Sequence, residues 1–335
     1  MFKVAVVGAT GAVGGTMLRV LEERGFPVSE LRALASLRSN GRQLDYLGRP
    51  VYVETLTDAA FEGIDIALFS AGSDRSRTFA PAAVEAGAVV IDNSSAFRLD
   101  ANVPLVVPEV NEADLEGHSG IIANPNCVAA PLVVALKPIA DAVGLERVVV
   151  SSYQSVSGTG AAAIAELLAE TRGNLSGNEP EPSVYPHPIA FNVLPHIDTF
   201  DESGYTGEER KVAAETRKML GLHDLAVSAT CVRVPVVQSH SAAVHIETSE
   251  KISAQHVREL FMGAPGVMLV DDPAHNRYPL PRDATGRDEV LVGRIREDSS
   301  HARGIALWVV SDNLRKGAAT NAVQIAESLV TRGWL

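Results

Sequence analysis

The N-terminal residues of the chain combine a short apolar run, a glycine turn and a helical pattern. Val4 to Val7 is β-branched and does not alternate with polar residues, which is typical of a strand buried on both faces. Gly8, Gly11 and Gly14 follow at once, and apolar residues then recur at helical spacing. This strand–turn–helix order predicts the start of an α/β domain with a parallel sheet.

The same alternation continues to about residue 143. We expect further buried strands at Leu31 to Leu37, Ile64 to Ser70, Ala88 to Asp92 and Gly120 to Ala123. Helices are expected at Ala80 to Ala86 and Val128 to Ile139. Strands that alternate with helices favour a doubly wound sheet, so the sequence predicts an N-terminal Rossmann-type dinucleotide-binding domain.

The pattern changes in the second half. Strands are expected at Leu145 to Val150, Ala226 to Val237, Ala242 to Thr248, Val290 to Ile295 and Gly304 to Val310, with a helix at Gly160 to Thr171. This mixture predicts an α+β domain with a mixed or antiparallel sheet. Residues 173–207 are rich in Gly, Pro, Asn and Ser, which indicates a functional or interface loop. An amphipathic helix is expected from Leu314 to Val330, because its apolar residues fall on one face.

Composition excludes several classes of protein. With a formal net charge of −12, the chain should repel nucleic acid and anionic membranes. Two cysteines are too few for a disulfide framework or a zinc finger, and they fit a reducing compartment. The apolar N-terminal run is too short for a signal peptide or a membrane span, so we expect a cytoplasmic protein.

The glycine turn is a candidate cofactor site. A helix that begins at such a turn offers backbone N–H groups to a pyrophosphate. The spacing is G-x-x-G-x-x-G, with Thr10 in place of the middle glycine of the usual fingerprint, so a glycine turn of another α/β protein is an alternative. Arg38, Ser39 and Arg42 follow the expected second strand, and the acidic residue of an NAD site is absent there. This favours a 2′-phosphate and NADP, although the arginines could also be solvated loop residues.

Cys127 is a candidate nucleophile. It follows Asn124-Pro125-Asn126 at the junction of an expected strand and an expected helix, which Asn124 or Asn126 could cap. A helix N-terminus lowers the pKa of a thiol, and its N–H groups can stabilise an oxyanion. An inert thiol is the alternative for Cys127, and it is the expectation for Cys231, which lies inside an expected strand.

His240 is the candidate acid/base partner. Arg233 and His240 flank Pro235 near the end of an expected strand, whereas His245 lies within a strand and is expected to be structural. The two histidines lack accompanying ligands at metal spacing, so no metal site is expected.

Arg98, after the strand that ends at Asp92, is a candidate anion clamp with a surface loop residue as the alternative. The glycine-containing turn at 153–160 either closes over a ligand or simply connects a strand to a helix.

Seven segments in the same order give the chain a resemblance to the aspartate-semialdehyde dehydrogenase family over almost its whole length. They are Gly8 to Gly14, Asn93 to Arg98, Asn124 to Cys127, Gln154 to Gly158, Glu208 to Lys211, Arg233 to His240 and Ser311 to Leu314. The resemblance implies NADPH-dependent reduction of L-aspartyl 4-phosphate to L-aspartate 4-semialdehyde through a cysteine acyl-thioester. It also implies a place in lysine (diaminopimelate), threonine and methionine biosynthesis.

The resemblance also implies a role for individual residues. Cys127 would be the nucleophile, His240 the general acid/base and Gln154 the residue that orients the acyl group. The substrate would contact Arg98, Asn126, Glu208, Lys211 and Arg233: Arg233 would hold its α-carboxylate, Glu208 its ammonium, and Arg98 with Lys211 its phosphate. NADP(H) would contact Gly8, Thr10, Gly11, Ala12, Val13, Arg38, Ser39, Ser157, Gly158 and Asn313.

The family's organisation implies a homodimer with two domains. Residues 1–127 with 313–335 would bind NADP, so that the C-terminal helix packs on the first domain, and residues 128–312 would carry substrate binding and dimerisation. One residue departs from the family's pattern, because Ser239 stands where many members have glycine before the histidine.

Other functions remain as alternatives. N-acetyl-γ-glutamyl-phosphate reductase uses the same covalent scheme, but its substrate has no free ammonium for Glu208. A glyceraldehyde-phosphate-type dehydrogenase has no substrate groups for Arg233 and Glu208. A non-catalytic binding paralogue would be expected to lack Cys127 or His240.

Overall fold

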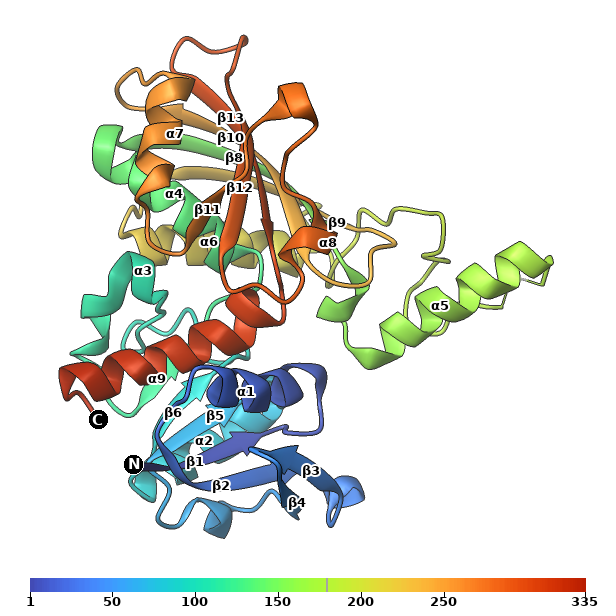
Figure 1. Cartoon of the computed structure of the whole chain (residues 1–335), viewed down its shortest axis with the longest axis vertical. Helices are drawn as coiled ribbons and strands as arrows, with labels where there is room; N and C mark the ends of the chain where they lie inside the picture. Colours follow the sequence, from blue (N-terminus) through green and yellow to red (C-terminus); the bar gives the residue numbers. More distant parts are fainter. Residues whose placement is uncertain (179) are drawn as a thin grey trace. The chain divides into compact units, whose positions relative to one another are not determined.

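The computed structural model describes residues 1–178 and 180–335. It contains two compact units, Met1–Asn126 with Ala318–Leu335 and Cys127–Gly317 (Figure 1). Each unit is described by itself below. The functional division into residues 1–127 with 313–335 and residues 128–312 stays a prediction.

A seven-stranded sheet forms the centre of the first unit, in the order β3-β4-β2-β1-β5-β6-β7. Its parallel strands are β1 (Phe2–Val7), β2 (Val28–Ala35), β4 (Arg49–Thr55), β5 (Ile66–Phe69), β6 (Val89–Asp92) and β7 (Ile121–Ala123). The edge strand β3 (Gln43–Tyr46) runs antiparallel to β4. The predicted doubly wound sheet is therefore confirmed.

Helices cover both faces of this sheet, which explains why β1 is apolar throughout. Val4 and Val6 belong to a core cluster with α1 (Ala12–Glu23) and α9 (Thr320–Arg332). Ala5 and Val7 belong to a second cluster, on the other face of the strand, with α2 (Ser73–Glu85). Because neighbouring residues of a strand point to opposite faces, both sets must be apolar.

Several predicted boundaries in this unit were wrong. The second strand begins earlier and ends at Ala35, and Leu37 starts a 3₁₀ turn, Leu37–Ser39. Helix α2 begins at Ser73 rather than at Ala80, and it contains Pro81. The predicted helix from Leu314 to Val330 is a π-helical turn, Arg315–Ala319, followed by α9. Its apolar face is buried as expected, and α9 belongs to the first unit.

The second unit contains a six-stranded mixed sheet, in the order β11-β12-β13-β10-β8-β9. Its strands are β8 (Leu145–Gln154), β9 (Ala226–Arg233), β10 (His240–Thr248), β11 (Val267–Leu269), β12 (Val290–Glu297) and β13 (Gly304–Ser311). The pairs β8–β9 and β11–β12 are parallel and the others antiparallel, so the predicted mixed sheet is confirmed. The helices α4 (Ala129–Val143), α6 (Gly207–Leu220) and α7 (Ala254–Met262) pack against it.

Helix α5 (Ala161–Ser176) extends from this unit with an irregular segment beside it (Figure 1). It runs five residues beyond the predicted end at Thr171. Two buried carboxylates of the helix hold the segment, because Glu166 accepts bonds from the amides of residues 183–185 and Glu170 from those of residues 189 and 190. The predicted loop 173–207 thus begins within α5, and Glu179 lies outside the described residues.

Two features of this unit differ from the pattern in the sequence. Strand β9 ends at Arg233 and not at Val237, because the proline at 235 cannot donate to a strand ladder. Helix α6 was not predicted, although a capping box of Thr206 and Glu209 marks its start.

Two further α-helices are short: α3 (Pro108–Asn111) and α8 (Pro281–Ala284). Among the helices so described, none is both long enough and apolar enough to cross a bilayer.

Candidate active site

Cys127 and His240 lie side by side in the second unit. The Sγ atom of Cys127 is 3.3 Å from Nε2 of His240. Cys127 stands two residues before α4, and His240 is the first residue of β10. A polarisable thiol in contact with an imidazole nitrogen is the arrangement that an activated nucleophile and its proton-transfer partner require.

The start of α4 differs from the prediction. Val128 is the N-cap residue, and its side chain makes no capping bond. Asn124 is therefore not the cap, whereas a contact of Asn126 with this helix start stays a prediction. The Asn124 amide instead donates to Asn93 Oδ1 at 2.7 Å, and it accepts a bond from Asn321 at 2.7 Å.

The imidazole of His240 is buried and fixed by neighbouring groups. The backbone N–H of Ser155 donates to Nδ1 at 3.0 Å, and the Ser155 hydroxyl lies 3.1 Å from the same atom. Burial lowers the pKa of His240 well below its usual value, and the charge of Arg233 lowers it further. His240 is thus held neutral and aimed at the thiol.

Ser239 sets the backbone path into His240. Its φ of +74° lies in the left-handed region that favours glycine. The Ser239 amide donates to Asn313 Oδ1 at 2.9 Å, and its hydroxyl lies 2.8 Å from Thr285 Oγ1. Serine therefore takes the conformation that glycine would take, and these two contacts hold it there.

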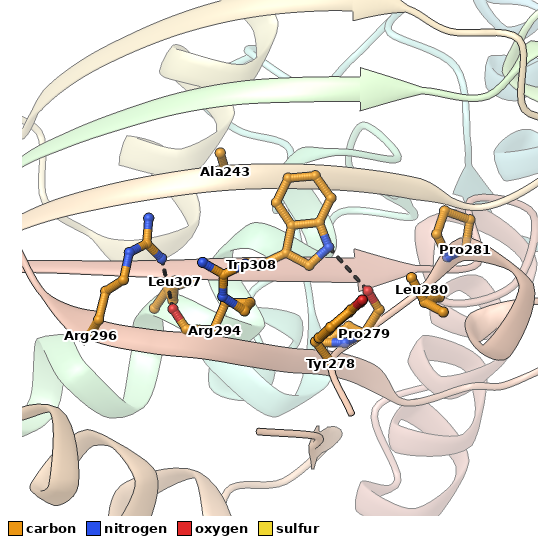
Figure 2. Close-up of a pocket in the computed structure, with 9 residues that line it drawn as sticks. All are labelled: Ala243, Tyr278, Pro279, Leu280, Pro281, Arg294, Arg296, Leu307 and Trp308. Atoms are coloured by element: carbon orange, nitrogen blue, oxygen red, sulfur yellow. Dashed lines mark hydrogen bonds between the residues drawn. The ribbon is translucent and has the colours of Figure 1, made fainter. Parts of the chain in front are cut away.

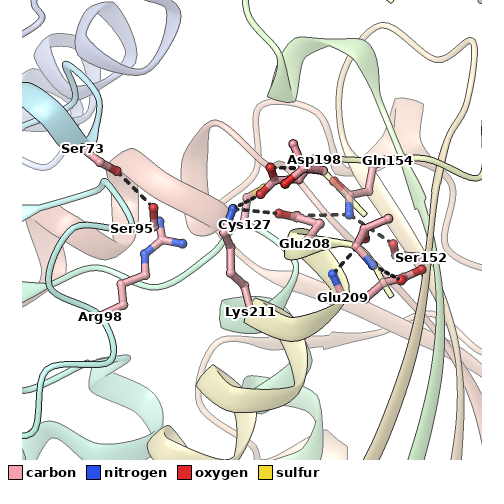
Figure 3. Close-up of polar contacts among 12 residues, drawn as sticks. Ser73, Ser95, Arg98, Cys127, Ser152, Gln154, Asp198, Glu208, Glu209 and Lys211 are labelled. Carbon is pink, nitrogen blue, oxygen red and sulfur yellow. Dashed lines mark hydrogen bonds and ion pairs between the residues drawn. The ribbon is translucent and has the colours of Figure 1, made fainter. Parts of the chain in front are cut away.

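A series of polar contacts links Gln154 through Glu208 to Lys211 (Figure 3). Gln154 Nε2 donates to Glu208 Oε1 at 3.3 Å, and Glu208 Oε2 is 4.0 Å from Lys211 Nζ. Lys211 is also paired with Asp198 Oδ2 at 2.6 Å, and this bond holds the pKa of the Asp198 carboxyl below its usual value. Gln154 ends β8, whereas Glu208 and Lys211 share the first turns of α6.

Arg233 presents a partly unused guanidinium. Its Nη1 donates to the Ser155 carbonyl at 2.8 Å, and its Nε is buried without a hydrogen-bond partner among the described residues. The Tyr185 ring lies 5.9 Å from the guanidinium carbon, and the Tyr185 hydroxyl donates to Thr159. A buried guanidinium with an unused N–H suits a carboxylate ligand.

Gly158 fits closely between two of these side chains. A Cβ at this position would lie 3.2 Å from Arg233 Nη1 and 3.3 Å from His240 Nε2. Ser157, one residue before it, donates to Asn313 Oδ1 at 3.0 Å. Contacts between neighbouring side chains thus link the candidate site residues of the second unit, which are Cys127, Gln154, Ser157, Gly158, Glu208, Lys211, Arg233, His240 and Asn313.

The first unit carries the predicted glycine turn. Gly8 has a φ of +85°, and a Cβ there would lie 2.7 Å from the Ser70 carbonyl oxygen. A Cβ on Gly14 would lie 2.2 Å from the Gly8 oxygen, so only glycine allows α1 to begin so close to β1. Gly11 is the N-cap of α1, and the helix begins at Ala12 and Val13 with no acid in its first turn. This backbone can receive a phosphate.

Other residues predicted to contact the cofactor follow the carboxyl ends of β1 and β2 in the first sheet. The hydroxyls of Thr10 and Ser39 are 3.5 Å apart, and Arg38 lies exposed in the turn that contains Ser39. These groups, at the ends of β1 and β2, fit a phosphorylated ribose.

Arg98 lies in the first unit and is largely buried. Its guanidinium donates to the carbonyls of Asn124 at 2.9 Å and Asn93 at 2.6 Å. Asn126 is buried at the last position of this stretch of the unit, directly before Cys127 in the chain. The backbone therefore fixes the orientation of Arg98, and the surface-loop alternative is wrong.

Known proteins match the whole chain. The family models "Semialdehyde dehydrogenase, NAD binding domain" and "Semialdehyde dehydrogenase, dimerisation domain" match residues 3–118 and 136–316. Aspartate-semialdehyde dehydrogenase of Aquifex aeolicus is 55% identical over 99% of both chains. The enzyme of Bacillus subtilis is 52% identical over 97% of this chain and 96% of its own. The chain belongs to the aspartate-semialdehyde dehydrogenase family.

Solved structures of the aspartate-semialdehyde dehydrogenase family agree with this assignment. The Vibrio cholerae enzyme II, complexed with ASA, has a TM-score of 0.96 and 51% identity, covering 99% of this chain and 98% of its own. The Candida albicans enzyme, with NADP, has a TM-score of 0.77 and 25% identity, covering 100% of both chains. As a member of this family the chain is an oxidoreductase, which disfavours a non-catalytic paralogue.

The second unit of this family member has a hollow of about 390 Å³ whose lining includes neither Cys127 nor His240 (Figure 2). It is lined by Ala243, Tyr278, Pro279, Leu280, Pro281, Arg294, Arg296, Leu307 and Trp308. None of these is a predicted site residue.

Three residues that contact candidate site residues of this aspartate-semialdehyde dehydrogenase family member were given no role from the sequence. Asp198 pairs with Lys211, Tyr185 lies near Arg233, and Ser155 contacts His240. Asp198 and Tyr185 fall in the segment 173–207, whose composition predicted a functional or interface loop but assigned no role to either residue. Ser155 acts mainly through its backbone, which no residue pattern reveals.

Proposed function

We propose that the chain catalyses the NADPH-dependent reductive dephosphorylation of L-aspartyl 4-phosphate to L-aspartate 4-semialdehyde. The observation that carries the proposal is the 3.3 Å contact of Cys127 Sγ with His240 Nε2, next to an arginine with an unused buried N–H. A thiol–imidazole pair supplies covalent catalysis, and the arginine supplies recognition of an anion.

The first chemical step is an attack by Cys127 on the acyl carbon. The thiolate sulfur forms a bond to that carbon, the carbonyl oxygen takes the negative charge, and the C–O bond to phosphate breaks. An acyl-thioester on Cys127 and inorganic phosphate result. His240 stabilises the oxygen and moves protons, and Gln154 orients the acyl group.

The charges of the second unit fit the amino-acid end of this substrate. Arg233 would bind the α-carboxylate through its free Nε side, and Glu208 would receive the ammonium. Lys211, in reach of Asp198 and Glu208, would bind phosphate together with Arg98, and Asn126 would contact the substrate. An N-acetylated substrate has no ammonium for Glu208, which disfavours the acetylglutamyl-phosphate reductase alternative.

The cofactor proposal depends on the glycine turn. Gly8, Gly11, Ala12 and Val13 would hold the pyrophosphate, and Thr10, Arg38 and Ser39 the phosphorylated ribose. Ser157, Gly158 and Asn313 would also contact the cofactor. When bound, NADPH supplies the hydride that reduces the thioester to the aldehyde.

The cellular setting is part of the same proposal. The reaction would serve lysine, threonine and methionine biosynthesis in the cytoplasm. A homodimer formed by residues 128–312 is supported by the dimerisation-domain model that matches residues 136–316. Light scattering of the purified protein measures that state.

The experiment that tests the function runs the reaction in reverse. Aspartate semialdehyde, phosphate and NADP⁺ should give a rise in nicotinamide absorbance that depends on all three. Turnover should be at least about tenfold slower with N-acetylglutamate semialdehyde, which lacks the ammonium. Well-folded protein without turnover would contradict the proposal, and equal rates with NAD⁺ would remove the role of Arg38.

A further inference from the structure

The contacts of His240 define which of its ring nitrogens carries a proton. An amide N–H can only donate, and that of Ser155 points at Nδ1 from 3.0 Å. Nδ1 must therefore offer a lone pair, and the ring proton of a neutral imidazole must sit on Nε2. Nε2 is the atom that lies 3.3 Å from Cys127 Sγ.

We propose that Ser155 is a positioning residue whose backbone N–H holds His240 in the neutral Nε2–H form, so that His240 serves Cys127 as a hydrogen-bond donor. This inference rests on the proposed roles of the two residues and deepens them. In the free enzyme, the Cys127 thiol has therefore not transferred its proton to the His240 imidazole.

The surroundings of His240 disfavour a second ring proton. An Nδ1–H would point at the Ser155 N–H, and two donors would face each other. Cys127 and Arg233 lie near the ring, and the Arg233 cation opposes a positive imidazolium, whereas a backbone hydrogen bond of Ser239 favours it to a smaller extent. Desolvation acts in the same direction as the Arg233 charge, because His240 is only 4% exposed.

A network of short polar side chains holds the Ser155 turn in place. The Ser155 hydroxyl donates to Asn313 Oδ1 at 3.2 Å, and the same oxygen accepts from Ser157 at 3.0 Å and from the Ser239 amide at 2.9 Å. One amide oxygen thus ties the turn after β8 to the residue before His240. The Ser155 carbonyl is held by Arg233.

The consequence for the reaction concerns the oxygen of the acyl group. When sulfur bonds to the acyl carbon, negative charge develops on that oxygen, and an Nε2–H in place beforehand stabilises it. The thiol proton leaves to solvent as the thiolate forms, so His240 need not take it up before the attack. The same donor stabilises the thiolate when it is released.

The direct test is ¹⁵N NMR of the free protein with ring-labelled histidine. The signals of His240 are assigned by their loss in His240→Gln. Between pH 6 and pH 9 we expect one acceptor and one protonated nitrogen in the Nε2–H pattern. An imidazolium at pH 7, or an Nδ1–H pattern, overturns the proposal. The measurement uses no substrate, so its failure is distinct from failure of the proposed activity.

Serine variants separate the amide from the hydroxyl. Ser155→Ala keeps the amide, so its His240 spectrum should retain the Nε2–H pattern, and a switch to Nδ1–H would overturn the assignment to the backbone. Ser311→Ala is the matched control, because Ser311 pairs with His240 across β10 and β13 and its buried hydroxyl has no partner among the described residues. That variant should leave both the spectrum and the turnover unchanged.

Kinetics test the donor role. His240→Ala should lower kcat by about 10²–10³-fold, the usual cost of losing an oxyanion donor. Glutamine can donate from a similar place but cannot take up a proton, so His240→Gln should recover about tenfold of that loss. Equal rates for the two variants would overturn a donor role and favour a proton-accepting one.

Discussion

The two cysteines of the second unit have the same functional group and opposite surroundings. Cys127 is partly exposed just before a helix and touches His240. Cys231 lies within β9 and is 1% exposed. The comparison predicts that the place of each thiol in the fold, and not its presence in the sequence, sets its reactivity.

Burial predicts that the Cys231 thiol is unreactive. Desolvation raises the pKa of Cys231 to about 12, and the carboxylates of Glu208 and Glu209 contribute in the same direction against a hydrogen bond to Ser152. The backbone N–H of Cys231 donates to Glu209 Oε1 at 3.0 Å. Through this hydrogen bond, Cys231 helps to hold the start of α6 against β9.

The largest difference between the two cysteines should appear in turnover. Cys127→Ala removes the nucleophile, and we expect kcat of the reverse reaction to fall by about 10⁴-fold or more. Cys231→Ala should stay within about threefold of the wild type, because it removes only a buried sulfur. Circular dichroism checks that both variants fold. Substantial turnover by Cys127→Ala would exclude the covalent mechanism.

Alkylation should separate the thiols next. At pH 8, iodoacetamide should modify Cys127 at least about 10²-fold faster than Cys231, because a thiol with a pKa of about 12 is almost fully protonated and is also shielded. Peptide mass spectrometry after timed quenching measures both rates. In urea the two rates should converge, and similar rates in the folded protein would contradict the difference in environment.

The fold could be predicted wherever burial alone decides the residue types. The apolar run from Val4 to Val7 predicted a strand covered on both faces, and the structure confirms it. Helix α6 was missed because it is mostly polar and buries the carboxylates of Glu208 and Glu209. Composition carries no sign of carboxylates that are buried with partners.

The site could be predicted where the reactive group itself identifies the residue. Cys127 and His240 stand out by their chemistry and their places in the chain, and the structure brings them into contact. Asp198 and Ser155 could not be found in this way, because their roles come from an ion pair and a backbone amide. Such contacts depend on tertiary structure that no local pattern encodes.

A glycine beside the nucleophile offers a finer test of its position. A Cβ on Gly317, in the π-helical turn before α9, would lie 3.1 Å from the Cβ and the carbonyl oxygen of Cys127. Gly317→Ala should therefore displace the sulfur by a few tenths of an ångström and lower kcat about tenfold with little change in KM. Gly263→Ala is the control, because a Cβ there meets nothing within 4 Å. Equal kcat values for both variants would show that Cys127 tolerates the shift.

The smallest expected effect concerns stability at alkaline pH. The pKa of Cys231 is about 12 in the folded chain against a usual 9.0, so above pH 9 the unfolded chain loses a proton that the folded chain keeps. The unfolded state then binds fewer protons, and the free energy of unfolding falls as pH rises, by about 1 kcal/mol between pH 8 and pH 10. Urea unfolding of wild type and Cys231→Ala at both pH values measures this term. Cys231→Ala loses some packing at both pH values. Between pH 8 and pH 10, however, its free energy of unfolding should fall by about 1 kcal/mol less than that of the wild type. An equal fall in both proteins would mean that the buried thiol does not contribute to the alkaline loss of stability.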